Sequence, residues 1–223
     1  SDDTEQVRVL LRKAIKLDNN LLRAKSYLGT TYRLEGKYDK ALEIFNENLN
    51  EADLLDDQIA KAGALLCLGL VYYHKGNYIK SIEYYNSSHS IFIELDDKPG
   101  ISNTLLNIGI IARRNGDYDK AIEFLKPSYE LSLKLQDKAG VLASYVNFTT
   151  TYVNKGDYDK ALIYCDRAME FFEDYGKRGE ANILNNYGIV YLRKKEYIKA
   201  IEYFDKVYKI IEKINLGDES RQW

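Results

Sequence analysis

The sequence predicts an all-α protein built as an array of tandem helix pairs. The first observation is a repeated motif, of which Gly116-Asp117-Tyr118-Asp119-Lys120-Ala121 is one copy. Its tyrosine recurs at positions 38, 78, 118, 158 and 197, so successive copies are 40, 40, 40 and 39 residues apart. The second observation is that 223 residues contain only two prolines, which favours long helices over strands and turns. A fixed period of this size is typical of a helical repeat array.

Bulk composition excludes several classes of function. The net charge is -2, so the chain lacks the excess of positive charge on which general nucleic-acid binding depends. No apolar run is long enough to span a bilayer, so we expect no membrane insertion. Cys67 and Cys165 fall in repeats that are not neighbours, so we expect two free thiols and a reducing, cytoplasmic location.

The first predicted element is an amphipathic helix from Thr4 to Leu17. It ends at the turn cluster Asp18-Asn19-Asn20. Its apolar residues recur at helical spacing and mark one face: Val7, Leu10, Leu11, Ala14 and Ile15. We interpret residues 1–19 as the second helix of a truncated repeat, and we expect the chain to be a fragment of a longer protein.

Five complete repeats are predicted next, each with a first helix, a turn, a second helix and a polar connector. Together they form a single array, and a tail that begins like another connector covers 215–223. The repeats are 20–56, 57–96, 97–136, 137–176 and 177–214. The first helices are expected at 20–35, 58–75, 98–115, 138–155 and 178–194. The second helices are expected at 38–54, 78–95, 118–135, 158–175 and 197–214.

The turns and connectors carry residues suited to helix ends. A turn glycine precedes each of the first four second helices, where the left-handed conformation of a helix C-terminus favours glycine: Gly36, Gly76, Gly116 and Gly156. Lys195 stands in the fifth turn and should cost about 1 kcal/mol if the backbone is the same. Aspartates in the connectors, including Asp97 and Asp137, can cap the next helix.

Small residues recur where the two helices of a pair must touch. Glycines stand seven residues before the turn position, at Gly29, Gly69, Gly109 and Gly188, and alanines stand five residues after it, at Ala41, Ala121, Ala161 and Ala200. Without bulky side chains the helix axes can approach closely. Aromatic residues are expected to fill the remaining space: Tyr32, Tyr72, Tyr152 and Tyr191 on first helices, and Phe45, Tyr85 and Phe204 on second helices.

This combination of glycine, aromatic, turn glycine, tyrosine, alanine and aromatic resembles the tetratricopeptide repeat (TPR). The long period resembles the subclass found in Pins/LGN-type scaffolds and in bacterial peptide-sensing regulators of the Rap and PlcR type. The resemblance implies a right-handed α-α superhelical solenoid whose first helices line a concave groove that binds proteins or peptides. Three positions depart from the pattern: Ala112, Thr149 and Lys195.

Asparagines recur on the first helices. Asn107, Asn147 and Asn186 share one place in three successive repeats, and Asn103 and Asn182 share another. An amide both donates and accepts, so such a ladder could hold an extended peptide backbone. The alternative is that each amide is satisfied by a hydrogen bond between helices.

Apolar residues form a second stripe on the first helices, away from the glycine and alanine contacts. It comprises Leu66, Leu70, Leu106, Ile110, Val146, Val153, Ile189 and Leu192. A continuous exposed apolar strip indicates a partner. The alternative is that neighbouring repeats cover it.

Basic residues gather with Tyr73 at the C-terminal ends of the first helices: Arg33, Arg113, Arg114 and Arg193. Such a ledge could bind acidic side chains or a C-terminal carboxylate. The alternative is that the cations complement the helix dipoles.

No catalytic, cofactor-binding or metal-binding motif is present, so we expect a non-enzymatic module without a cofactor. Two functions remain. The chain is either a protein- or peptide-binding module, acting as a scaffold or as the sensory part of a regulator, or a structural spacer that self-associates through its repeat ends.

Overall fold

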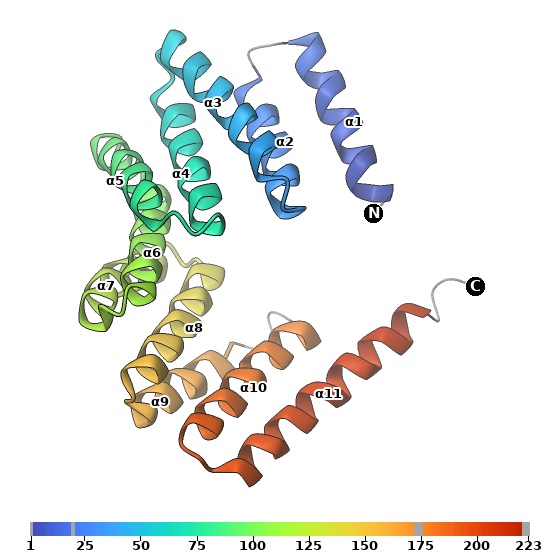
Figure 1. Ribbon diagram of the computed structural model, residues 1–223, viewed down its shortest axis with the longest axis vertical. Helices are drawn as coiled ribbons and strands as arrows, with labels where there is room; N and C mark the ends of the chain where they lie inside the picture. Colours follow the sequence, from blue (N-terminus) through green and yellow to red (C-terminus); the bar gives the residue numbers. More distant parts are fainter. Residues whose placement is uncertain (1, 19–20, 172–175, 220–223) are drawn as a thin grey trace. The chain divides into compact units, whose positions relative to one another are not determined.

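The computed structural model describes residues 2–18, 21–171 and 176–219 (Figure 1). These residues form eleven α-helices and no strand, which confirms the all-α expectation. The helices are α1 (Asp2–Leu17), α2 (Leu22–Leu34), α3 (Tyr38–Leu54), α4 (Gln58–His74), α5 (Tyr78–Glu94), α6 (Lys98–Arg114), α7 (Tyr118–Lys134), α8 (Lys138–Lys155), α9 (Tyr158–Met169), α10 (Gly176–Arg193) and α11 (Tyr197–Glu219).

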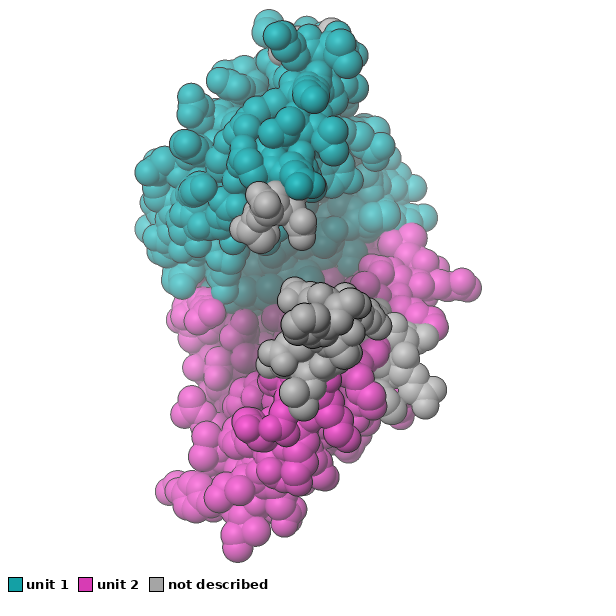
Figure 2. All heavy atoms as spheres, turned by 90° about the vertical axis from the view of Figure 1, so that its right-hand side faces the viewer, with its two compact units in different colours: residues 1–111 teal, residues 112–223 magenta. Residues whose placement is uncertain are grey.

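The chain divides into two compact units, residues 1–111 and 112–223, which Figure 2 colours separately. In unit 1, α1 contacts α2, and the helices from α2 to α5 pack in chain order. In unit 2, the helices from α7 to α11 do the same. First helices also contact one another directly, α2 with α4 and α8 with α10. The first helices α2, α4, α8 and α10 therefore each pack against their own second helix and against another first helix of the same unit.

The turns inside the repeats have the predicted backbone. The four turn glycines have φ between 73° and 85°. At the first turn, the N–H of Gly36 donates to Arg33 and that of Lys37 donates to Tyr32, a pattern that satisfies the last carbonyls of α2. Lys195 has φ 64°. It therefore adopts the same left-handed conformation without being glycine.

The connectors between repeats use a left-handed residue that the sequence pattern did not reveal. Asp56, Asp96 and Gln136 have φ between 51° and 55° at the ends of α3, α5 and α7. Asp97 caps the following helix through a bond of 2.9 Å from a backbone N–H group, as predicted, and Asp57 does the same at the start of α4.

Asp137, which was also predicted to cap a helix, forms no capping bond with its side chain. Instead, the side chains of Asn77, Asp117 and Asp157 cap second helices, each from the position after a turn glycine.

Two helix boundaries near the C-terminus differ from the prediction. α9 ends at Met169 rather than 175, where the N–H of Phe171 donates to Ala168 three residues back and tightens the last turn. Part of the expected helix, 172–175, lies outside the described residues. α11 continues to Glu219, beyond the expected end at 214, because no proline interrupts it.

Close helix contacts are made where glycine meets an aromatic ring. A β-carbon added to Gly29 would stand 2.5 Å from the ring of Phe45, one on Gly69 would stand 2.6 Å from Tyr85, and one on Gly188 would stand 2.5 Å from Phe204. Any side chain at these three glycines would therefore force the helices apart. The four alanines of the pattern are at most 2% exposed. These contacts confirm the predicted packing within the helix pairs.

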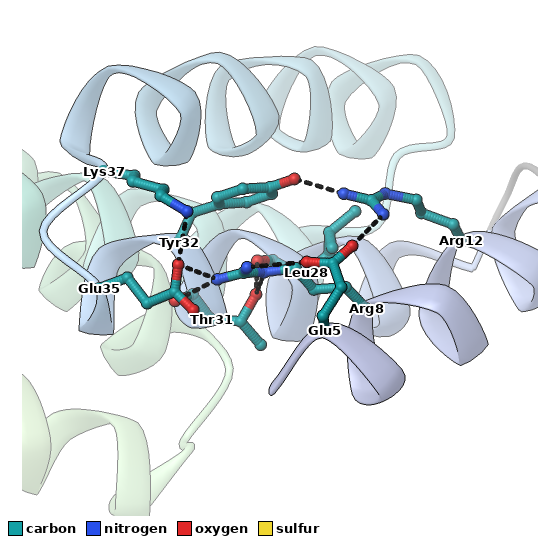
Figure 3. A network of polar contacts seen from close by, with 8 residues as sticks. All are labelled: Glu5, Arg8, Arg12, Leu28, Thr31, Tyr32, Glu35 and Lys37. Carbon is teal, nitrogen blue, oxygen red and sulfur yellow. Dashed lines mark hydrogen bonds and ion pairs between the residues drawn. The ribbon is translucent and has the colours of Figure 1, made fainter. Parts of the chain in front are cut away.

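A buried arginine holds α1 against α2 (Figure 3). Arg8 is 3% exposed, and its guanidinium lies 4.3 Å from the ring centre of Tyr32. Its Nε donates to the Thr31 hydroxyl at 3.0 Å, and its Nη2 lies 2.7 Å from a Glu35 carboxylate oxygen. Glu5 receives a further bond of 3.1 Å. The guanidinium is thus surrounded by acceptors and two carboxylates, as burial of a charge requires.

The apolar face predicted for the first helix is only partly buried. Leu11 and Ile15 pack against the core of unit 1, whereas Val7 and Leu10 are exposed. Arg8, which follows Val7 in the sequence, is buried on this face because its charge is neutralised by partners on α2 and in the following turn.

Candidate functional site

The predicted site residues all lie on first helices and are at least partly accessible. In unit 1 they are Arg33 on α2, Leu66, Leu70 and Tyr73 on α4, and Asn103, Asn107 and Ile110 on α6. In unit 2 they are Arg113 and Arg114 at the end of α6, Val146 and Asn147 on α8, and Asn182, Asn186, Ile189 and Arg193 on α10. One neighbour in the apolar stripe differs, because Val153 is 7% exposed and belongs to the core.

A pocket of about 650 Å³ opens in unit 1 at the N-terminal ends of α2, α4 and α6. This size is within the usual range for ligand pockets. Only Leu66 and Asn103 among its residues were predicted. The full lining is Leu21, Leu22, Arg23, Ser26, Asp57, Ile59, Ala60, Gly63, Leu66, Phe92, Asp97, Pro99, Gly100 and Asn103. A sequence signal for it exists in Gly63, an isolated glycine inside a helix.

Two of the predicted asparagine amides, those of Asn107 and Asn147, bond within their own helices rather than between helices. Asn107 Nδ2 donates to the carbonyl of Asn103 at 2.8 Å, and Asn147 Nδ2 donates to that of Ala143 at 2.9 Å. Each bond uses one of the two N–H groups of the amide. A second N–H and the amide oxygen are the groups that a peptide backbone needs.

The basic residue of α2 lies beside a histidine of α4. Arg33 Nη1 is 3.3 Å from His74 Nε2, and the His74 ring stacks on Tyr38 with 6.0 Å between ring centres. Partial burial, and secondly the charge of Arg33, lower the pKa of His74 below its ordinary value. His74 is therefore neutral at pH 7 and accepts from Arg33. No carboxylate of a described residue pairs with Arg33, so its guanidinium can receive one from outside.

The cysteines and histidines form no reactive cluster in the described residues. Burial raises the pKa of the Cys67 thiol to about 11 and that of Cys165 to about 12, so both are protonated at neutral pH. His89 Nδ1 lies 2.7 Å from the Thr104 hydroxyl, which itself donates to backbone carbonyls. Residues 2–18, 21–171 and 176–219 contain no group of three potential metal ligands. None of the helices they form is long and apolar enough to cross a membrane.

Comparisons with known proteins agree with this architecture. The profile of the family described as Tetratricopeptide repeat matches residues 61–134 and 140–213. No curated protein sequence matches the chain. A solved structure of BtubC (BKLC) from P. vanneervenii is similar, with a TM-score of 0.78 and 21% identity, over 96% of this chain and 90% of that one.

Two further solved structures belong to longer chains. A Rap protein complexed with Competence and Sporulation Factor has a TM-score of 0.75 and 19% identity, over 92% of this chain and 63% of that one. Aspartyl phosphate phosphatase F from Bacillus subtilis has a TM-score of 0.69 and 19% identity, over 94% of this chain and 55% of that one. At these identities the similarity concerns the fold alone.

Proposed function

This chain belongs to the tetratricopeptide repeat family, and on that basis we propose that it is an interaction module that binds a peptide or an extended protein segment on its first helices. The observation that carries the proposal is the pocket of unit 1, whose lining comes from the N-terminal ends of three first helices and from Phe92 of α5. The Rap structure, which holds Competence and Sporulation Factor, supports it by analogy of fold.

The proposed binding surface combines three kinds of contact. In unit 1, Asn107 would fix the ligand backbone, and half-buried residues such as Leu70 and Ile110 would cover apolar side chains. In unit 2, Asn147 would fix a ligand backbone in the same way. Arg33 would bind an acidic side chain or a C-terminal carboxylate, because guanidinium groups pair with carboxylates bidentately. A partner with these groups suits a scaffold or the sensory part of a regulator.

We also propose that the chain acts without catalysis and in the cytoplasm. Its two cysteines are free, which suits a reducing compartment, and burial raises the pKa of both thiols, which does not suit a nucleophile. The similarity to aspartyl phosphate phosphatase F covers 55% of that protein, so it does not transfer an enzymatic activity to this chain.

A second function, a structural spacer that self-associates, is favoured by apolar side chains on the terminal helices. Leu10 of α1 is 65% exposed, and Ile201 and Tyr208 of α11 are 66% and 64% exposed. Repeat arrays need polar outer faces on their end repeats to remain soluble as monomers. Light scattering over a range of protein concentrations, with and without Ile201→Asp, measures this association.

Peptide selection tests the principal proposal. The complete chain is immobilised, a random peptide library is passed over it, and retained peptides are measured against Ile110→Asp and Glu123→Ala variants. We expect Ile110→Asp on α6 to weaken binding and Glu123→Ala on the second helix α7 to leave it unchanged. Retention of no peptide, or equal losses in the two variants, would contradict the proposal.

A further inference from the structure

Gly63 differs from the glycines that pack the helix pairs. A β-carbon on Gly29, Gly69 or Gly188 would collide with an aromatic ring, whereas a β-carbon on Gly63 would have no atom within 4 Å beyond its own helix. Gly63 also has no left-handed backbone. Neither packing nor conformation therefore requires glycine at this position.

Glycine at position 63 carries a cost in stability. In a helix interior it costs about 0.5–1 kcal/mol relative to alanine. The equivalent positions, one period away on α2 and α6, are Arg23 and Asn103, and both line the same pocket. A side chain is thus compatible with this place in the repeat. Because Gly63 has no side chain, the pocket is open at this position, whereas the equivalent positions carry the side chains of Arg23 and Asn103.

The pocket walls are largely apolar and partly exposed to solvent. Ile59 is 64% exposed and Leu21 is 38% exposed, while Leu66 is half-buried and Phe92 is 6% exposed. Removing such surface from water is favourable by about 25 cal/mol per Å². The occupant that gains most from this pocket is a bulky apolar side chain.

The charged residues that line the pocket indicate which charged group the ligand should carry beside its apolar side chain. Asp57 and Asp97 each accept a capping bond through Oδ1, and neither forms an ion pair with a described residue. Arg23 is also without an ionic partner among the described residues. Two carboxylates against one guanidinium leave one formal negative charge, which favours a cationic group on the ligand.

We propose that this pocket binds a bulky apolar side chain of a peptide whose neighbouring residue is lysine or arginine, with Asp57 and Asp97 accepting from the cation. The proposal rests on the proposed peptide-binding function and specifies the peptide. It places apolar and basic residues at the N-terminal ends of α2, α4 and α6. The Arg33 guanidinium lies instead at the C-terminal end of α2 and would receive an acidic group.

Three variants test the pocket without damaging the fold. Gly63→Leu fills it, and because no atom lies within 4 Å of the new β-carbon, we expect its thermal midpoint to equal or exceed that of the wild type. Ser87→Leu adds the same side chain to the exposed surface of the second helix α5 and is the matched control. The double variant Asp57→Asn, Asp97→Asn removes both charges and keeps both caps, because asparagine caps helices as well as aspartate does.

The experiment selects peptides from a random library on the complete wild-type chain and measures the selected synthetic peptides by fluorescence anisotropy. We expect the selected peptides to share an apolar residue next to lysine or arginine. Gly63→Leu should weaken them at least about tenfold, and Ser87→Leu should not change their affinity. The double asparagine variant should weaken them about two- to fivefold per charge removed and reduce the dependence on salt.

The outcomes separate this proposal from the proposed function. Peptides that bind equally to the wild type and to Gly63→Leu would overturn the pocket proposal while leaving peptide binding intact. Selected peptides with acidic residues beside the apolar one would overturn the assignment of Asp57 and Asp97. If the library yields no peptide at all, the proposed function fails and the pocket proposal fails with it.

Discussion

The thiol of Cys165 on α9 lies 3.8 Å from the hydroxyl oxygen of Thr149 on α8, and both side chains are buried. In three of the other complete repeats the two equivalent positions hold a glycine and an aromatic ring, as in Gly69 and Tyr85, and in the third repeat they hold Gly109 and Leu125. Threonine is larger than glycine, and cysteine is smaller than an aromatic residue. The two departures from the repeat pattern therefore compensate each other within one helix contact.

Compensation predicts strong coupling between these two positions. Cys165→Phe alone should destabilise the protein by about 1–3 kcal/mol, because the ring would overlap the threonine side chain. Adding Thr149→Gly should recover most of that loss by restoring the glycine–aromatic pair. Urea unfolding of both single variants and the double variant gives the coupling energy. Free energies that simply add would show that the pair does not compensate.

The strained turn predicts a stabilising substitution. Lys195 has φ 64°, a conformation that costs a residue with a β-carbon about 1 kcal/mol. Lys195→Gly should therefore raise the free energy of unfolding by about 0.5–1 kcal/mol, measured by urea titration. The reciprocal change, Gly156→Lys, serves as the control. Its backbone has φ 85° and its side chain would meet open space, so only conformational strain should destabilise it. Equal stability of Lys195→Gly and the wild type would refute the strain.

The Arg8 network predicts a loss of stability in acid. Hydrogen bonds from Arg8 and then from Lys37 lower the pKa of Glu35 from 4.5 to about 2. Because the pKa is lower in the folded protein than in the unfolded chain, the contribution of Glu35 is fully present above pH 4.5 and disappears as the pH falls towards 2. Protonation would leave the buried guanidinium of Arg8 without that carboxylate.

Glu35→Gln provides the matched comparison for this pH effect. At neutral pH it should be less stable than the wild type, and the difference should shrink as the pH falls from about 5 to about 3. Denaturant unfolding at several pH values measures both. A difference that is independent of pH would mean that the Glu35 charge does not stabilise the docking of α1.

The repeat period made most helix boundaries predictable, because four of the five copies of the motif carry their own turn glycine. The features that were not predicted depend on contacts between residues that do not occupy equivalent positions in the repeats. Arg8 is polar in sequence and buried in space, since Thr31 and Glu35 approach it from another helix and the turn that follows. Where the pattern weakens, around Met169 and after 214, the predicted boundaries were wrong.

The candidate site was predictable in its helices and not in its pocket. Recurring asparagines and apolar residues identified the first helices, because equivalent positions share a face. The pocket depends on residues at the starts of the first helices, such as Leu21 and Ile59, and on the missing side chain of Gly63. The neighbouring helix decides whether a helical glycine packs against a ring or faces open space. The sequence around the glycine does not show which of the two occurs.

The last prediction concerns the proposed ligand surface. The side-chain amide of Asn147 donates one N–H to the carbonyl of Ala143, so its other N–H and its oxygen are the groups with which it would bind a peptide backbone. Asn147→Ala should weaken a selected peptide by about 1–2 kcal/mol, since hydrogen bonds would be left unmade. Ile110→Asp should weaken it further by placing a charge on the apolar strip.

The matched control for both substitutions is Glu123→Ala, an exposed residue of the second helix α7. Isothermal titration with the same peptide gives the three affinities, and thermal unfolding confirms that each variant is folded. Equal losses for Asn147→Ala and Glu123→Ala would mean that the peptide does not bind to the first helices. Such a result would favour the spacer function, in which association through α1 and α11 replaces binding of a peptide.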